Sequence, residues 1–188
     1  PCLAERWEGS DGGKVWTFHL RPGVRFQAQA EGQPTANGGR EVRASDVKYS
    51  IERLILTDSP RAYFLDMVKG YQDFMSRDVT GVTEWAGVKV IDEKTVQFEL
   101  DYPFAPFVAM LAYPTFSVVP QEDAEKWGKD FGFHPVGTGA FAFEKWEHDI
   151  RISLKKNPDY WRIDARGERL PYMDGVEFVV VPDDAVAY

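Results

Sequence analysis

The chain contains little of what metal, redox and nucleophilic sites require. It has one cysteine, Cys2, so an internal disulfide and a multi-cysteine metal site are both excluded. Its three histidines, His19, His134 and His148, are far apart and form no His-Glu-x-x-His pattern, which argues against a zinc site. No serine stands in a Gly-x-Ser-x-Gly elbow. We therefore expect no catalytic residue, no metal, no cofactor and no enzymatic activity.

Basic runs and long apolar runs are also scarce. The formal net charge is −8, and the densest basic run is the pair Lys155 and Lys156, which is too short for a nucleic-acid interface. No segment approaches 18 uninterrupted apolar residues, so the sequence contains no candidate membrane span. Hydrophobic residues nevertheless make up 44% of the chain and aromatic residues 14%, which is typical of a globular protein with a substantial core.

The ends of the sequence suggest a piece of a longer protein. The chain begins at Pro1 without a targeting segment and stops at Tyr188, shortly after a strand-like run. Cys2 leads directly into patterned sequence, so we expect a partly buried, unreactive side chain there and no lipid modification.

Apolar periodicity predicts strands and helices in mixed order, which indicates the α+β class. A helix is expected from an N-cap at Ser45, with Asp46 in its first turn and an apolar stripe that includes Ile51 and Ile55. The polar segment 27–40 is expected to be a long, flexible loop. The expected strands cover 15–20, 24–26, 88–90, 96–100, 150–154 and a buried strand at 176–181; further helical segments cover 61–75 with a break at Gly70, 106–112 and 122–129.

The glycines of Gly137-Thr138-Gly139-Ala140-Phe141-Ala142 match the Gly-x-Gly-x-x-Ala pattern of dinucleotide-binding sites. That pattern requires a buried strand before the first glycine and a helix after the last. Here a turn-like segment precedes and an alternating, strand-like segment follows. We therefore interpret Gly137 and Gly139 as structural turn residues that permit a positive φ or a close backbone approach. The tryptophans Trp7, Trp16, Trp146 and Trp161 are expected to lie in the core or at a subdomain interface.

Several stretches resemble one known family in the family's own order, and together they cover nearly the whole chain. The family comprises the extracytoplasmic solute-binding proteins of ABC importers, in the oligopeptide-, dipeptide- and nickel-binding group known as solute-binding family 5. One departure is Ala140, where the family usually has proline before the aromatic residue. The matching stretches are LAERWE (3–8), WTFHLRPGVRF (16–26), ASDVKYSIER (44–53), PVGTGAF (135–141) and KNPDYW (156–161).

The resemblance implies a periplasmic-binding-protein type II-like fold, of which this chain would supply the accessory subdomain of the first lobe with flanking strands. Residues 1–26 would be strands of the first-lobe binding subdomain that lead into the accessory subdomain. Residues 27–134 would form the accessory subdomain, and residues 135–188 would return toward the first-lobe binding subdomain. The second lobe, which closes over the ligand in this family, would be absent from the chain.

The resemblance also implies a function: capture of a small solute, with oligopeptides or dipeptides expected first, and delivery to an ABC permease in the membrane. The expected location is periplasmic or extracytoplasmic, where a lipid anchor on the full-length protein is compatible with the family, and the expected state is a monomer without a nucleic-acid partner. Met110, Tyr113 and Phe116 lie in a family region that approaches the cleft, so they are the expected ligand-binding residues. The alternative is a stand-alone extracytoplasmic interaction or sensor module without a transport role, which a large patch of exposed aromatic residues would favour.

Overall fold

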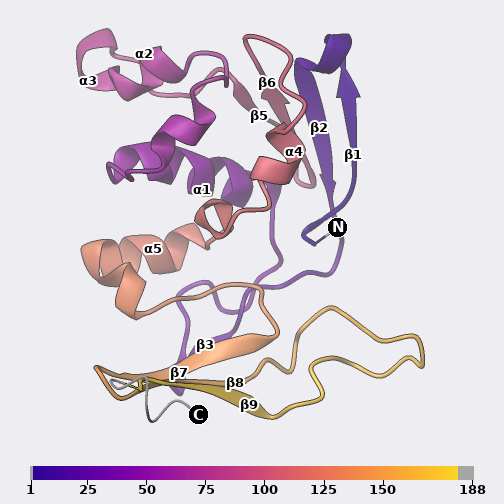
Figure 1. Cartoon of the computed structure of the whole chain (residues 1–188), viewed down its shortest axis with the longest axis vertical. Helices are drawn as coiled ribbons and strands as arrows, with labels where there is room; N and C mark the ends of the chain where they lie inside the picture. Colours follow the sequence, from indigo (N-terminus) through magenta and orange to yellow (C-terminus); the bar gives the residue numbers. More distant parts are fainter. Residues whose placement is uncertain (1, 182–188) are drawn as a thin grey trace. The chain divides into compact units, whose positions relative to one another are not determined.

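The computed structural model of the chain describes residues 2–181, except for the side chains of residues 79 and 80. Helices and strands alternate without a regular strand–helix–strand rhythm (Figure 1), which confirms the predicted α+β class. The elements are β1 (Ala4–Ser10), η1 (Asp11–Gly13), β2 (Val15–Leu20), β3 (Gln29–Ala30), β4 (Gln33–Pro34), α1 (Ala44–Leu56), η2 (Ala62–Leu65), α2 (Tyr71–Met75), α3 (Arg77–Thr80), β5 (Val88–Asp92), β6 (Thr95–Glu99), α4 (Phe107–Met110), η3 (Pro114–Phe116), α5 (Gln121–Trp127), η4 (Gly128–Phe133), β7 (Phe141–Glu147), β8 (Arg151–Lys156) and β9 (Gly175–Val179).

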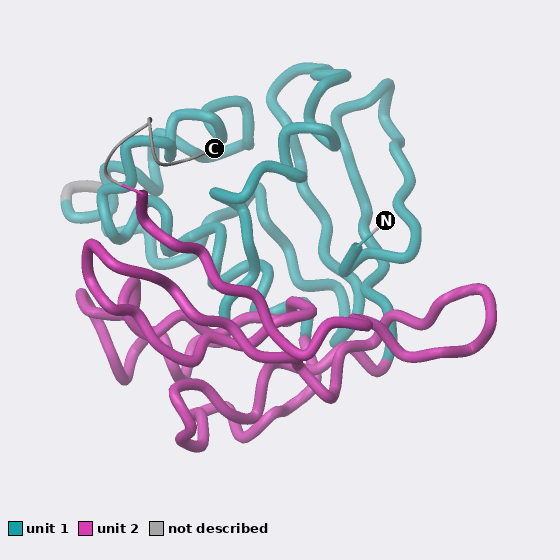
Figure 2. Tube along the Cα trace, turned by 60° about the horizontal axis from the view of Figure 1, so that its bottom comes forward, with its two compact units in different colours: residues 1–22, 43–119 teal, residues 23–42, 120–188 magenta. Residues whose placement is uncertain are grey.

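The chain forms two compact units, each built from two separate segments (Figure 2). Unit 1 contains residues 1–22 and 43–119, and unit 2 contains residues 23–42 and 120–188. These boundaries differ from those expected after residues 26 and 134. Strand β2 pairs with β6, so the first two strands belong to the same unit as the central segment.

Unit 1 is built on an antiparallel sheet with the strand order β1-β2-β6-β5. The predicted alternation of 15–20 is confirmed, because Phe18 and Leu20 are buried on one face of β2. Phe18 lies opposite Val96, and its ring meets the ring of Phe98 edge-on at 5.7 Å between centroids. Helix α1 packs against β5 and β6 and covers this face of the sheet.

Helix α1 begins two residues earlier than predicted. Its N-cap is Arg43 rather than Ser45, and its first residue is Ala44. The Asp46 carboxylate accepts the backbone N–H of Arg43 at 2.8 Å, as the N3 residue of a capping box does. The apolar stripe is confirmed by Ile51 and Ile55, which are 3% and 1% exposed. The predicted break at Gly70 is also present, since this residue has a φ of 74° directly before α2.

A second aromatic cluster in unit 1 surrounds Trp85, which is 1% exposed. Its ring stacks on Phe74 at 5.5 Å and contacts Tyr71 at 5.8 Å, and its indole N–H donates to the Lys69 carbonyl at 2.9 Å. The placement of the other tryptophans was predicted less well. Trp7, on the edge strand β1, and Trp146 are 41% and 37% exposed, so neither lies in the core. The other expectation for them, a place at a subdomain interface, stays a prediction.

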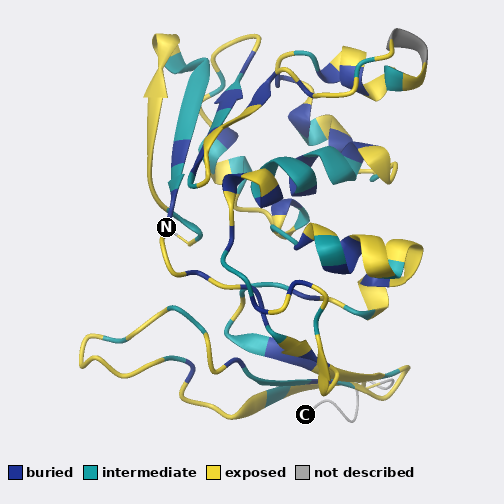
Figure 3. Ribbon diagram, turned by 180° about the vertical axis from the view of Figure 1, so that it is seen from behind, coloured by how far each residue is buried: buried dark blue, intermediate teal, exposed yellow. Residues whose placement is uncertain are grey.

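Unit 2 contains the antiparallel sheet β7-β8-β9. The predicted strand at 176–181 is present as β9, but it is not buried: Phe178 and Val179 are 59% and 63% exposed (Figure 3). The physical reason is its edge position, because β9 pairs with β8 alone in this sheet. The short strand expected at 24–26 is reduced to a single bridge between Arg25 and Glu41.

The segment expected to be a flexible loop, 27–40, is tied into unit 2 by hydrogen bonds. It carries the small hairpin β3–β4. The Asp123 carboxylate, 1% exposed at the start of α5, accepts the backbone N–H groups of Ala36 and Asn37 at 2.7 and 3.0 Å. It also accepts the Asn37 side-chain amide at 2.6 Å. A buried carboxylate thus satisfies three donors of a segment that has almost no secondary structure of its own.

Candidate functional site

The segment expected to contact a ligand lies in unit 1 and consists of two short helical turns, α4 and η3. Pro106 and Pro114 stand at the starts of these turns, where a missing N–H has no cost. Tyr113 lies between the turns and is 57% exposed, whereas Met110 is half-buried. Phe116 is only 6% exposed, so its side chain contributes mainly to packing. Of the three expected residues, Tyr113 therefore has the most surface to offer a ligand.

Tyr113 belongs to a row of three aromatic rings that we call the aromatic row: Tyr63, Phe64 and Tyr113. The ring centroids of Tyr63 and Phe64 lie 4.5 Å apart, and those of Phe64 and Tyr113 lie 6.4 Å apart. Phe64 is half-buried in the middle, while Tyr63 at the other end is 60% exposed. Two exposed tyrosine rings with a phenylalanine ring between them offer an apolar surface that also carries hydroxyl groups.

The sequence patterns did not indicate Tyr63 and Phe64 as site residues. They lie in η2, which is more than 40 residues before Tyr113 by its numbering, and only the folded chain brings the three rings together. The one available signal was local. Tyr63 and Phe64 are adjacent aromatic residues, and adjacent residues of a helical turn cannot both point into the protein core, so one of the two rings is expected at the surface.

The predicted turn at Gly137 and Gly139 lies in unit 2 and leads into β7. Its backbone is held by two buried amide side chains. Gln27 donates through Nε2 to the Phe141 carbonyl at 2.8 Å and accepts the Gly137 N–H through Oε1 at 3.3 Å. Asn157 donates through Nδ2 to the Gly139 carbonyl at 2.8 Å. The bend is thus fixed by side chains from two distant segments.

The expected conformational reason for the glycines is wrong. Neither Gly137 nor Gly139 has a positive φ, and a Cβ at Gly137 would meet no atom within 4 Å. A Cβ at Gly139 would make only an ordinary contact of 3.8 Å with the Phe141 carbonyl. The bend is therefore set by its hydrogen-bond partners, and no phosphate-binding helix follows it, because β7 begins at Phe141.

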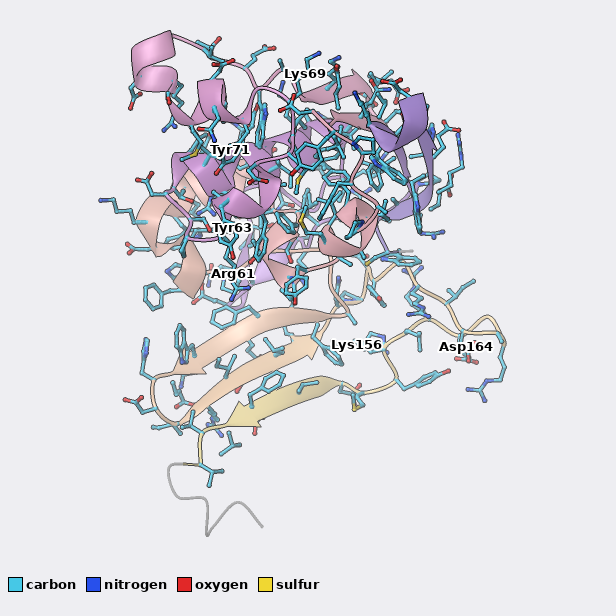
Figure 4. The ribbon with its side chains drawn as sticks, turned by 45° about the horizontal axis from the view of Figure 1, so that its top comes forward. Arg61, Tyr63, Lys69, Tyr71, Lys156 and Asp164 are labelled. Carbon is cyan, nitrogen blue, oxygen red and sulfur yellow. The ribbon has the colours of Figure 1, made fainter. Side chains whose placement is uncertain are left out.

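Two carboxylates of the described surface, those of Glu99 and Asp164, are held by hydrogen bonds and ion pairs. Glu99 lies between Lys69, labelled in Figure 4, and Lys89, whose Nζ atom is 2.7 Å from the carboxylate. Hydrogen bonds from these two lysines lower the pKa of Glu99 to about 2. In the loop before β9, the Tyr172 hydroxyl and the backbone N–H of Glu168 lower the pKa of Asp164 to about 2. Both carboxylates are held in the ionised form and are poorly suited to proton transfer at neutral pH.

Replacing Glu99 by glutamine is expected to lower stability at pH 7 by at most about 1 kcal/mol, since the pair lies at the surface. Folding lowers the pKa of Glu99 from 4.5 to about 2, so the contribution is fully present above pH 4.5 and is lost as the pH falls toward 2. Urea denaturation of both proteins between pH 7 and pH 3 measures this. The difference in stability between the two proteins should shrink on acidification, and a constant difference would contradict the assignment. Glu93→Gln, at an exposed glutamate in the turn between β5 and β6, is the control.

Within residues 2–181, no group of three or more histidine, cysteine, aspartate or glutamate side chains is arranged to hold a metal ion. No helix in this range is long and apolar enough to cross a membrane. Cys2 is exposed rather than partly buried as expected.

Comparison with known proteins identifies the family. The model of "Bacterial extracellular solute-binding proteins, family 5 Middle" matches residues 1–188. The dipeptide-binding protein of Escherichia coli K12 is 36% identical over 194 residues, which cover 100% of this chain and 34% of the relative. The structure of a periplasmic oligopeptide-binding protein from Borrelia burgdorferi matches with a TM-score of 0.81 at 27% identity, over 99% of this chain and 35% of that one.

A periplasmic binding protein from Helicobacter pylori, solved in complex with the peptide STSA, matches with a TM-score of 0.72 at 32% identity. The match covers 100% of this chain and 35% of that structure. The chain thus spans about a third of the length of the relatives that it matches, and over that part it has their fold. The chain belongs to family 5 of the bacterial extracellular solute-binding proteins.

Proposed function

We propose that the protein captures dipeptides or oligopeptides outside the cytoplasmic membrane and delivers them to an ABC permease, without a catalytic step of its own. The family membership of the whole chain carries this proposal. The similar proteins named for a ligand support the substrate class, since they bind dipeptides, di- or tripeptides and glutathione, which is itself a peptide.

Within this function, unit 1 would contribute one wall of the ligand site through the aromatic row. Rings that are exposed and held in place by neighbours present apolar area at little entropic cost on binding. Met110 and Phe116 would support Tyr113 from the same segment. The subdomain division stays a proposal: residues 27–134 would form the accessory subdomain, between the strands of residues 1–26 and the return strands of residues 135–188. Its boundaries do not coincide with those of the two compact units.

Replacing Tyr113 by alanine is expected to weaken peptide binding by about tenfold, the effect of losing a well-placed aromatic contact. The free energy of unfolding should change by less than about 1 kcal/mol, because the side chain is 57% exposed. Isothermal titration calorimetry and urea denaturation of the protein at its full natural length separate the two effects. Tyr102→Ala removes a tyrosine of unit 1 with a similar exposure, 50%, and is the matched control. Unchanged affinity in the Tyr113 variant would remove this residue from the site.

One observation favours a second candidate, an interaction module. In unit 2 the rings of Phe133, Trp146 and His148 form a surface cluster, with Trp146 stacked on Phe133 at 5.4 Å and on His148 at 4.3 Å. Phe133 is 46% exposed and Trp146 is 37% exposed. Such a cluster is the kind of patch that a protein partner covers.

Mass spectrometry of small molecules released on denaturation of the purified full-length protein tests the proposal. A mixture of short peptides would support an oligopeptide binder that reads the peptide backbone. One defined sugar, metal chelate or other compound would keep the importer function and overturn the peptide substrate. No released molecule, together with no thermal shift from a peptide or sugar panel, would favour the interaction module.

A further inference from the structure

An arginine without a partner stands next to the aromatic row. Arg61 is the N-cap residue of η2, and its backbone N–H donates to Ser59 Oγ at 3.4 Å. Its side chain is exposed, and within residues 2–181 the structure gives its guanidinium no hydrogen bond, ion pair or ring contact. Arg77, in the same unit, differs because its guanidinium lies over the Phe74 ring at 6.0 Å.

Arg61 directly precedes η2, the helical turn that carries Tyr63 and Phe64 of the aromatic row. Arg61 and Tyr63 are two residues apart, and Figure 4 shows their side chains on the same side of unit 1. Tyr63 is 60% exposed and joins the row through Phe64. Asp58 and Asp66 flank Arg61 in the sequence, yet neither forms an ion pair with it in the described part of the chain. The guanidinium is therefore available to an external anion.

A guanidinium beside an apolar surface favours one kind of ligand group, a carboxylate. A guanidinium donates two parallel hydrogen bonds to a carboxylate, a geometry that a lysine ammonium does not reproduce. An apolar surface beside it strengthens the ion pair, because a ligand that covers the rings also excludes water from the charges. A ligand that satisfies both features has a carboxylate within one side-chain length of an apolar or aromatic group.

We propose that Arg61, with Tyr63 and Tyr113, forms a subsite for a peptide carboxylate that is adjacent to an apolar side chain. The subsite rests on the proposed peptide-binding function and deepens it, since it would make the protein prefer peptides with a free carboxylate at this point. That carboxylate has two sources, the peptide C-terminus or an acidic side chain, and these are distinguished by blocking the C-terminus as an amide.

Isothermal titration calorimetry of the full-length protein with three synthetic peptides tests the subsite: Ala-Phe, Ala-Phe amide, and Ala-Glu-Phe amide. Each is titrated into the wild-type protein and into the Arg61→Gln and Arg61→Lys variants. Arg6→Gln is the matched control, because Arg6 is an exposed arginine of unit 1 on β1 with no partner in the described part of the chain and no place in the aromatic row. Circular dichroism checks that each variant is folded.

We expect Arg61→Gln to weaken binding of one carboxylate-bearing peptide by about tenfold and to leave Ala-Phe amide within about twofold. Arg61→Lys should recover only part of the loss, and Arg6→Gln none of it. Loss confined to Ala-Phe assigns the C-terminal carboxylate, and loss confined to Ala-Glu-Phe amide assigns an acidic side chain. Equal affinities in wild type and Arg61→Gln, or an equal loss for all three peptides, would overturn the subsite alone. No binding of any peptide by the wild-type protein would overturn the proposed function and the subsite with it.

Discussion

Replacing Asp123 by alanine is expected to lower the free energy of unfolding by about 4 kcal/mol, in the upper tail of single-residue effects. The buried carboxylate accepts the backbone N–H groups of Ala36 and Asn37 and the Asn37 side-chain amide. Alanine would leave these donors without an acceptor in a site that is closed to water, and each orphaned donor costs about 1–3 kcal/mol. The loss falls on the part of segment 27–40 around Ala36 and Asn37, so the backbone amides there should lose protection from hydrogen exchange first.

Urea denaturation gives the free energy, and amide hydrogen exchange of residues 27–42 locates the loss. Glu125→Ala is the matched control, because Glu125 is an exposed acidic residue of the same helix, α5, and its loss should cost less than about 0.5 kcal/mol. Asp123→Asn keeps the shape of the side chain but places an amide N–H₂ where an acceptor is needed, so it should also be clearly destabilising. An Asp123→Ala variant within about 1 kcal/mol of the wild type would show that water or backbone groups replace the carboxylate.

The elements that could be predicted from the sequence are those whose signal is local. The alternation of β2, the turn between β5 and β6, and the apolar stripe of α1 each depend on neighbours within a few residues. The position of Gly70 directly before α2 could be predicted for the same reason, since its positive φ is a property of one residue. The two-residue error at the start of α1 arose because arginine is not a usual N-cap residue, whereas serine is, so Ser45 was chosen over Arg43.

The links made by buried polar side chains could not be predicted, because their partners are distant in the sequence. Asp123 reaches a backbone N–H that is 87 residues away, and Gln27 reaches a carbonyl that is 114 residues away. In the sequence, a polar residue that will bind a distant backbone group looks the same as one that will stay in solvent. The resulting mistakes were consistent: segment 27–40 was expected to be flexible, and the bend at Gly137 was attributed to glycine itself rather than to Gln27 and Asn157.

The candidate site shows the same limit. The family resemblance indicated the segment that holds Tyr113, but not the partners of its ring, since Phe64 and Tyr63 approach it only through the tertiary fold. Burial is likewise a property of the whole fold. Phe116 and Tyr113 are three residues apart and similar in character, yet one is 6% and the other 57% exposed.

Trp85→Ala is the second substitution with a large expected effect, a loss of about 4 kcal/mol in the free energy of unfolding. The side chain is 1% exposed, so its removal leaves a large cavity beside Tyr71 and Phe74 of α2. The Lys69 carbonyl would lose the indole N–H that it accepts at 2.9 Å. Trp85→Phe keeps the stacking on Phe74 but not this hydrogen bond, so it should lose about half as much.

Urea denaturation of the alanine and phenylalanine variants separates packing from hydrogen bonding, with Trp7→Ala as the control for loss of an exposed tryptophan. The control should lose less than about 1 kcal/mol, because a side chain that is 41% exposed leaves no closed cavity. Equal losses in the two Trp85 variants would assign the stabilisation to the indole N–H, and no loss in the phenylalanine variant would assign it to ring packing. Lys69 pairs with Glu99 through its ammonium group, and its backbone carbonyl accepts the Trp85 indole N–H. Trp85→Ala should therefore also reduce the loss of stability at low pH that the Lys69–Glu99 pair causes. A measured pH dependence identical to that of the wild type would show that the two ends of Lys69 act independently.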